Sequence, residues 1–170
     1  MSRTKRFITS IAASALAFGA LFVAAPANAE APAGPYSMIN RNSGRCIEVN
    51  NASLADGAGV LQWTCHRMNH QLWRVNDLGN GYVQLRVEHS DKCLEVNNAS
   101  QSPAAGVLQW LCHGGTHQQW KRIDRGNGYF QLQARHSSQC LEIDHAWTHN
   151  GAGALQWPCH DGLHQQWRLS

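Results

Sequence analysis

An acid, two tryptophans and two histidines stand close together in the first part of this chain, and side chains of these types can build a binding site. They are Glu48, Trp63, His66, His70 and Trp73. A carboxylate accepts hydrogen bonds from hydroxyl groups, a flat indole packs against the apolar face of a ring, and imidazole can donate or accept. The same residue types return twice more along the 170 residues, so their spacing bears directly on the fold.

The spacing is constant, because each of these positions recurs after 47 residues and again after 47 more, without an insertion or deletion. Cys46, for example, returns as Cys93 and Cys140. Self-similarity at a fixed period is the signature of a repeat architecture, so the sequence predicts a threefold internal repeat. The predicted units share this step and span about residues 36–76, 77–123 and 124–170.

Within each repeat, apolar residues alternate with polar ones, which is the period of a half-buried strand. Val83, Leu85 and Val87 show the alternation plainly. Turn-forming stretches such as residues 79–81 and 126–128 separate the strands, and no stretch of 12 residues after position 29 carries a helical apolar stripe. The pattern predicts an all-β fold with about four short strands per repeat, or about twelve in all.

Twelve strands in three equal units must hide their edges, and closure into a barrel of threefold symmetry does so, as in the β-trefoil. A Gln-any-Trp motif at residues 71–73, 118–120 and 165–167 stands in register with repeated Trp-any-Cys and Cys-aliphatic-acid motifs. In these motifs the sequence from Tyr36 to Ser170 resembles the ricin B-chain-type lectins, which include the family 13 carbohydrate-binding modules. The resemblance implies a β-trefoil that binds carbohydrate.

Glu48 and Trp63 are expected to lie on the same face of a pair of strands. If Cys46 lies opposite Cys65 across an antiparallel pair, Glu48 lies opposite Trp63, with both side chains on the face of the cysteines. A carboxylate beside an indole suits a shallow sugar site, because sugar hydroxyls donate to the carboxylate while the sugar ring stacks on the indole. The repeat predicts the same arrangement three times.

The resemblance implies binding roles for the same positions and adds two histidines and a glutamine to each. The expected carbohydrate contacts are Glu48, Trp63, His66, His70 and Gln71; Glu95, Trp110, His113, His117 and Gln118; and Glu142, Trp157, His160, His164 and Gln165. This chain has Glu and His where the family usually has Asp and Asn, so the family's preference for galactose is not carried over. The alternative is three solvated surface acids beside exposed histidines.

The expected function is glycan binding without catalysis, by a lectin with up to three equivalent sites. A glycosidase needs two carboxylates within roughly 5 to 10 Å of each other, and threefold symmetry spreads the three acids apart. The expected partner is an oligo- or polysaccharide, with galactose- and xylose-containing glycans as candidates. The alternative is a protein-binding β-trefoil, such as an enzyme inhibitor or a toxin-associated subunit. Retention of the site residues in every repeat favours the lectin.

Residues 1–29 have the features of an export signal and predict a secreted protein. Basic residues precede an apolar run, and Ala27 and Ala29 suit cleavage after position 29. A membrane-anchoring helix is the alternative, since the run is long enough to span a bilayer. Cleavage would remove three of the 14 Lys and Arg residues and none of the 11 acids, leaving a neutral chain. Neither nucleic acid binding nor membrane insertion is expected, and residues 36–170, after a linker of residues 30–35, are expected to form a monomeric domain.

Six cysteines arrive as three identical pairs, and paired cysteines in an exported protein predict disulfides. The pairing that repeats with the chain joins the two cysteines of each unit: Cys46–Cys65, Cys93–Cys112 and Cys140–Cys159. Each bond would close a loop of about 20 residues and stabilise the fold by roughly 3 kcal/mol. A zinc site of Cys65, His66 and His70 is the alternative. Oxidation on export and the lack of a CxxC motif argue against it, so neither a metal nor another cofactor is expected.

Two further predictions concern the interior. The tryptophans of the Gln-any-Trp motif, Trp73, Trp120 and Trp167, are expected in the core. Alternation along the strand before the second cysteine also turns one glutamine of each repeat inward: Gln62, Gln109 and Gln156. An unpaired buried amide costs about 1 to 3 kcal/mol, so each is expected to bond to backbone or to another amide.

Overall fold

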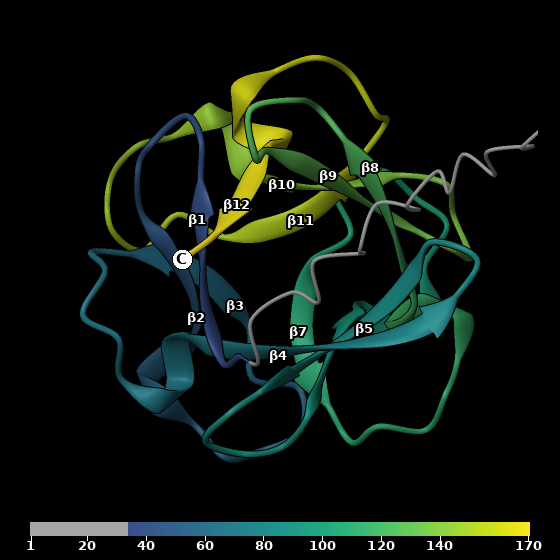
Figure 1. Cartoon of the computed structure of the whole chain (residues 1–170). Helices are drawn as coiled ribbons and strands as arrows, with labels where there is room; N and C mark the ends of the chain where they lie inside the picture. Colours follow the sequence, from purple (N-terminus) through teal and green to yellow (C-terminus); the bar gives the residue numbers. More distant parts are fainter. Residues whose placement is uncertain (1–33) are drawn as a thin grey trace, which may run out of the picture. The chain divides into compact units, whose positions relative to one another are not determined.

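Twelve short β-strands and six 3₁₀ turns build the part of the chain that the structure describes, which is residues 34–170 of a computed structural model (Figure 1). The strands are β1 (Tyr36–Asn40), β2 (Cys46–Val49), β3 (Val60–Trp63), β4 (Leu72–Gly79), β5 (Tyr82–Val87), β6 (Cys93–Val96), β7 (Val107–Trp110), β8 (Trp120–Asp124), β9 (Phe130–Ala134), β10 (Cys140–Ile143), β11 (Ala154–Trp157) and β12 (Trp167–Leu169). The turns are η1 (Asn50–Ala52), η2 (Asn69–Gln71), η3 (Asn97–Ala99), η4 (Thr116–Gln118), η5 (Asp144–Ala146) and η6 (Leu163–Gln165). None of these turns has the length or hydropathy that a bilayer-crossing helix needs. The predicted signal peptide, residues 1–29, and most of the predicted linker lie outside the described residues.

Six of the strands close into an antiparallel barrel. Strand β1 pairs with β12 and β4, β5 pairs with β4 and β8, and β9 pairs with β8 and β12, which completes the ring. The other six form the hairpins β2–β3, β6–β7 and β10–β11, one in each of the three lobes of Figure 1. Closure leaves no free edge in the ring, and the architecture is the predicted β-trefoil. The repeat boundaries predicted near residues 76 and 123 fall inside β4 and β8, slightly before these strands end.

Apolar side chains of all three repeats meet inside the barrel. The tryptophans predicted for the core, Trp73, Trp120 and Trp167, are fully buried there. The indole N–H of Trp73 donates to the carbonyl of Ile47 at 3.2 Å, and the other two indoles bond to the matching strand of their own repeat. Each buried indole therefore has its polar atom satisfied while it fills the core.

The three inward-facing glutamines are fully buried, which confirms the prediction for Gln62, Gln109 and Gln156. The Gln62 amide donates to the carbonyls of Trp147, at 2.8 Å, and His149, at 2.9 Å, and its oxygen accepts from the Ser43 hydroxyl at 2.6 Å. The other two glutamines make the same bonds to the loops of the first and second repeats. Each amide thus fastens one hairpin to a loop from another repeat.

The register of the β2–β3 hairpin differs from the one expected. Cys46 pairs with Trp63, and Glu48 pairs with Leu61, because Cys65 lies beyond the end of β3 and the disulfide reaches from β2 into the following loop. The difference amounts to two residues, so the alternation of faces is kept, and Glu48 and Trp63 still share one face. The disulfides join the predicted pairs, Cys46–Cys65, Cys93–Cys112 and Cys140–Cys159.

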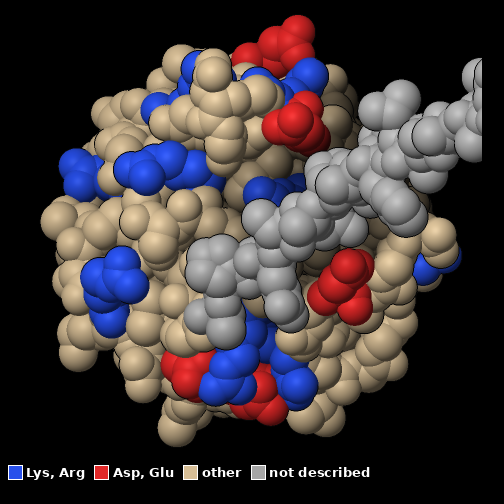
Figure 2. Space-filling model, in the orientation of Figure 1, with Lys and Arg blue, Asp and Glu red and all other residues tan. Residues whose placement is uncertain are grey.

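Charged side chains of both signs are interspersed on the surface, and several form pairs. On the face shown in Figure 2, Lys and Arg stand in separate groups, some of them directly beside Asp or Glu. Arg74 contacts Glu88 at 2.5 Å, and Arg86 contacts Asp91 at 2.8 Å. Exposed pairs of this kind contribute little to stability.

Candidate functional site

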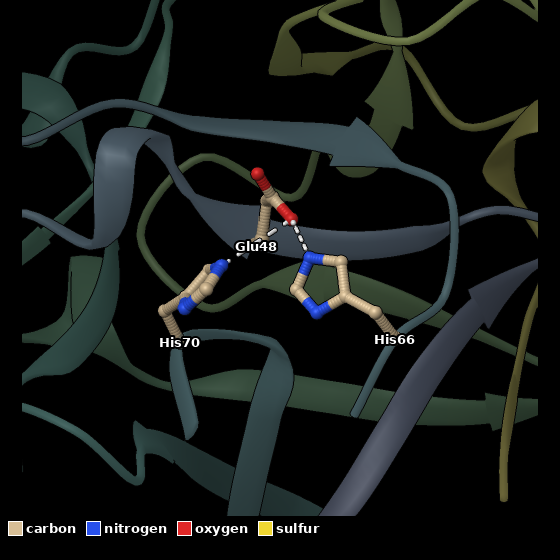
Figure 3. A group of neighbouring side chains, drawn as sticks. All are labelled: Glu48, His66 and His70. Atoms are coloured by element: carbon tan, nitrogen blue, oxygen red, sulfur yellow. Dashed lines mark ion pairs between the residues drawn. The ribbon is translucent and has the colours of Figure 1, made fainter. Parts of the chain in front are cut away.

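Glu48 on β2 is the meeting point of two imidazoles from other parts of the first repeat. His66 follows β3, and its Nε2 lies 3.4 Å from Oε2 of Glu48. His70 lies in the turn η2, and its Nε2 is 3.7 Å from the same oxygen. Figure 3 shows both rings pointing at this carboxylate. Hairpin and turn together therefore bring three of the predicted site residues into one group.

The same group recurs in the other repeats, as Glu95 with His113 and His117 and as Glu142 with His160 and His164. The two imidazole centroids are 5.0 Å apart in every copy. Only 6% of Glu48 is exposed to solvent, and the other two acids are as deeply buried. The acids are therefore not solvated surface groups, in contrast to the alternative interpretation of the sequence.

Gln71 holds the acid from behind. Its amide donates to Oε2 of Glu48 at 2.6 Å and to a backbone carbonyl at 3.0 Å, while its oxygen accepts from the backbone N–H of His66 at 2.9 Å. Gln71 is fully buried, as are Gln118 and Gln165, which bond in the same way. The sequence placed these glutamines among the carbohydrate contacts. In the structure they are fully buried, and their amides bond to the acid.

Backbone contacts fix the proton of the first histidine in each group. Nδ1 of His66 accepts from the N–H of Met68 at 3.3 Å, so the neutral ring carries its proton on Nε2, facing Oε2 of Glu48. Gly115 and Gly162 supply the same N–H in the other repeats, at 3.1 and 3.0 Å. Among residues 34–170 no donor bonds to the second oxygen, Oε1 of Glu48, so this atom can accept from a ligand.

The second histidine of each group is neutral at pH 7. Burial lowers the pKa of His70 below its ordinary value of 6.5 and outweighs the opposing effect of Glu48, while the nearby imidazoles of His66 and His89 lower the pKa further. Burial is also the main cause that lowers the pKa of His117 and of His164. The sites therefore present uncharged imidazole beside a buried carboxylate.

A half-exposed tryptophan lies on the same face of each hairpin as the acid. Trp63 ends β3 with 40% of its surface exposed, and Trp110 and Trp157 are exposed to the same degree. In the third repeat, Trp157 lines one open hollow of about 220 Å³ with Glu142, His160 and His164. In the third repeat the structure thus brings together the acid, the indole and both histidines that the sequence predicted.

The third hollow has two more polar residues that the sequence analysis missed. Asp144 and His145 also line it, with His145 Nδ1 at 2.6 Å from the Asp144 carboxylate. Trp147 stacks on His145 with ring centroids 5.1 Å apart. The signal was present, because residues 144–147 break the Asn-Asn-Ala-Ser sequence that the other two repeats share. Residues that do not recur at the 47-residue step give no periodic signal.

Two other histidines lie behind the sites of the first and second repeats and were also missed. His89 packs edge-on against His70 with centroids 6.1 Å apart, and His136 packs in the same way against His117. Nε2 of His89 lies 2.9 Å from a backbone carbonyl, and its Nδ1 is buried without a partner among the described residues. Asn42 occupies the corresponding position beside the third site, so this layer is not threefold.

The sequence also matches a known family over most of its length. A family model described as ricin-type β-trefoil lectin domain-like matches residues 22–110, 69–157 and 116–170. The chain belongs to this family. The barrel with three hairpins is the fold of a ricin-type β-trefoil protein, and the three overlapping matches follow the threefold repeat.

Solved structures agree with this assignment. The designed threefold-symmetric protein ThreeFoil is 45% identical, with a TM-score of 0.78 over 79% of this chain and 96% of its own. An exo-β-1,3-galactanase from Clostridium thermocellum is 30% identical, with a TM-score of 0.77 over 79% of this chain but 29% of the enzyme. The C-half of an earthworm R-type lectin, solved with GalNAc, shares the fold at 16% identity, a TM-score of 0.61, and coverage of 79% and 96%. The match to the ricin-type lectin family supports carbohydrate binding in general.

Proposed function

We propose that the protein is a secreted lectin that binds glycans at up to three equivalent shallow sites and does not cleave them. The observation that carries the proposal is the threefold recurrence of a buried acid, a half-exposed tryptophan and two histidines. In each site a sugar hydroxyl donates to the free carboxylate oxygen, while the apolar face of the sugar ring stacks on the indole. The family assignment supports the same use of this face of the hairpin.

The sites suit single sugar units of a longer chain. A hollow of about 220 Å³ is smaller than the pockets that hold drug-sized ligands, which begin at about 300 Å³. One shallow site is expected to bind a monosaccharide at about millimolar strength, or roughly 4 kcal/mol. Several sites that engage one polymer raise the overall affinity without new contacts. The natural partner is therefore an oligo- or polysaccharide.

Galactose-containing glycans are the first to test, because a galactanase and a GalNAc-bound lectin are among the similar structures. Xylose-containing polymers are the second, because the histidine after the second cysteine resembles that of xylan-binding family members. Glu in place of the usual Asp moves the carboxylate outward by about one bond, so a preference different from galactose would fit the reshaped site.

Binding without hydrolysis is supported by the number of carboxylates at the first two sites. The position of Asp144 holds asparagine in the first two repeats, so each of those groups has a single acid, whereas hydrolysis requires a pair. Secretion is supported by the three disulfides and by the signal-like residues 1–29.

A glycan array read with a matched pair of variants tests the proposal. The protein is expected to bind polysaccharide glycans, and the triple variant Trp63→Ala, Trp110→Ala and Trp157→Ala is expected to lose this binding while it stays folded. Trp147→Ala is the control, because Trp147 is similarly exposed but does not line the hollow. If the triple variant still binds glycans, the three tryptophans are not part of the binding sites and the proposed sites are wrong. A lack of binding to every glycan on the array, together with capture of a protein partner, would favour the protein-binding alternative.

A further inference from the structure

We propose that each of the three Glu-His-His groups binds a divalent transition metal ion, for which zinc is the best fit. In the first repeat the ligand atoms are Oε2 of Glu48 and the Nε2 atoms of His66 and His70. The sequence predicted no metal, and its alternative zinc site required the thiol of Cys65. That cysteine is in a disulfide, and the structure puts a carboxylate in its place.

The distances from the acid oxygen to each histidine nitrogen match a tetrahedral ion. Across the three groups the distances from Nε2 to Oε2 are 3.4, 3.7, 3.4, 3.6, 3.5 and 3.5 Å. With zinc bonds of about 2.0 to 2.2 Å, tetrahedral geometry sets neighbouring ligand atoms about 3.4 Å apart, and octahedral geometry sets them about 2.9 Å apart. All ligand atoms of a group lie within 4.8 Å of one another. An ion could therefore be bound with small side-chain movements.

The surroundings hold the ligands in place before any ion arrives. The Gln71 amide bonds to the oxygen of Glu48 that would bind the ion, at 2.6 Å, and such a partner typically orients a metal-binding carboxylate. His66 lies in the loop that the Cys46–Cys65 disulfide attaches to β2. Three protein ligands leave a fourth position for water on the side of His66, whose side chain is 33% exposed.

The hydrogen bond from the Met68 N–H to Nδ1 of His66 opposes zinc binding and limits its affinity. The neutral His66 ring carries its proton on Nε2, because Nδ1 accepts from Met68. An ion needs the lone pair of Nε2, so the proton must move to Nδ1, and the Met68 N–H then loses its acceptor. We therefore expect micromolar affinity, weaker than that of four-ligand structural zinc sites. The same contact supplies a marker, since the amides of Met68, Gly115 and Gly162 should respond to the ion.

The stoichiometry of zinc uptake tests the proposal. The purified protein, freed of metal with a chelator and without any glycan, is titrated with zinc chloride in a calorimeter. We expect saturation at three ions per chain. Cobalt(II) should bind in the same number and give the intense visible absorption of a four-coordinate ion. In an amide NMR spectrum, zinc should shift the signals of Met68, Gly115 and Gly162.

Single histidine variants locate the ions. His70→Gln, His117→Gln and His164→Gln should each lower the stoichiometry from three to two, and the triple variant should bind none. The two unaltered sites in each single variant report that the chain is folded. His149→Gln is the matched control, because this histidine lies outside the three groups, and it should leave three ions bound.

Two results would overturn the proposal. One is the lack of saturable uptake by the folded protein, and the other is uptake that persists in the triple variant, which would assign the ions to other histidines. The titration contains no sugar, so its outcome is independent of the proposed lectin function. A protein that binds glycans and takes up no zinc would keep the first proposal and lose this one.

Discussion

The smallest feature with a measurable effect is the partly buried neutral histidine of each site, His70, His117 or His164. Burial lowers the pKa of His70, His117 and His164 below 6.5, so the folded protein takes up their protons at a lower pH than the unfolded chain does. Stability must then fall as protons are added in this range. The effect is small at each site, but it occurs three times in one chain.

We therefore predict that the free energy of unfolding decreases as the pH falls below about 6.5. Denaturant titrations at pH 7.5 and 5.5, with a chelator present, measure the loss. The triple variant His70→Gln, His117→Gln and His164→Gln should lose less stability over the same interval, because glutamine does not titrate. An equal loss in both proteins would assign the pH effect to other groups.

Another prediction at this scale concerns a single backbone angle. Ala104 has a φ of 63°, in the left-handed region, where the corresponding residues of the other repeats are Gly57 and Gly151. A side chain in this region is strained, and glycine is not. Ala104→Gly should raise the free energy of unfolding by about 0.5 to 1 kcal/mol, after allowance for the greater freedom of the unfolded glycine.

The reverse change provides the control for Ala104. Gly57→Ala should destabilise the protein by a similar amount, since an added Cβ would meet the Trp110 ring at an ordinary 3.5 Å and would introduce only the backbone strain. Both variants are measured by chemical denaturation. If the two changes shift stability in the same direction, the φ angle is not the cause.

At the scale of elements, the hairpins depend on their inward glutamines. Gln62 bonds to two carbonyls of the 147–149 loop, and its oxygen accepts from Ser43. Gln62→Leu would keep the volume but leave these groups unpaired, so we expect a loss of about 2 to 4 kcal/mol in the free energy of unfolding. Denaturant titration measures it. Gln101→Leu, which removes one exposed bond from the amide to the His136 carbonyl, should change stability by less than about 0.5 kcal/mol, and a Gln62 effect as small as this would contradict the bridging role.

The elements also show why part of the structure could be predicted from the sequence. The 47-residue step and the alternation of Val83, Leu85 and Val87 determine the number of strands and their buried faces. The register of β2 against β3 was predicted wrongly, because a shift of two residues keeps every face unchanged. Only the position of Cys65 beyond the strand end, which the pattern does not contain, separates the two registers.

The residues that form the site could be predicted from the sequence, but the burial of its acid could not. The acid, the indole and both histidines were recognised from recurrence, but the burial of Glu48 depends on Gln71 and on the way the hairpin packs, which are tertiary contacts. The additional residues of the third hollow, Asp144 and His145, do not recur and so carried no periodic signal. Their roles in binding, like those of the recurring residues, remain predictions.

At the scale of the whole molecule, the number of sites should determine how strongly a polymer binds. Trp63→Ala, Trp110→Ala and Trp157→Ala, introduced one after another, are expected to weaken polysaccharide binding in steps, because each removes one of several linked contacts. Affinity electrophoresis or calorimetry with a soluble polysaccharide measures the steps. If one change abolishes binding and the others have no effect, only one repeat binds and the trivalent arrangement is wrong.

The bonds between repeats also determine what a shorter gene could encode. One repeat alone lacks the loop to which its inward glutamine donates hydrogen bonds. It also lacks partners for the barrel strands that pair across repeat boundaries, such as β1 with β12 and β4 with β5. A chain of one unit could satisfy these groups only by associating with two copies of itself, and its folding would then depend on protein concentration. Joining three units in one chain removes that dependence. Each unit keeps its own acid and histidines, so tandem fusion also multiplies the proposed site without any new site having to arise.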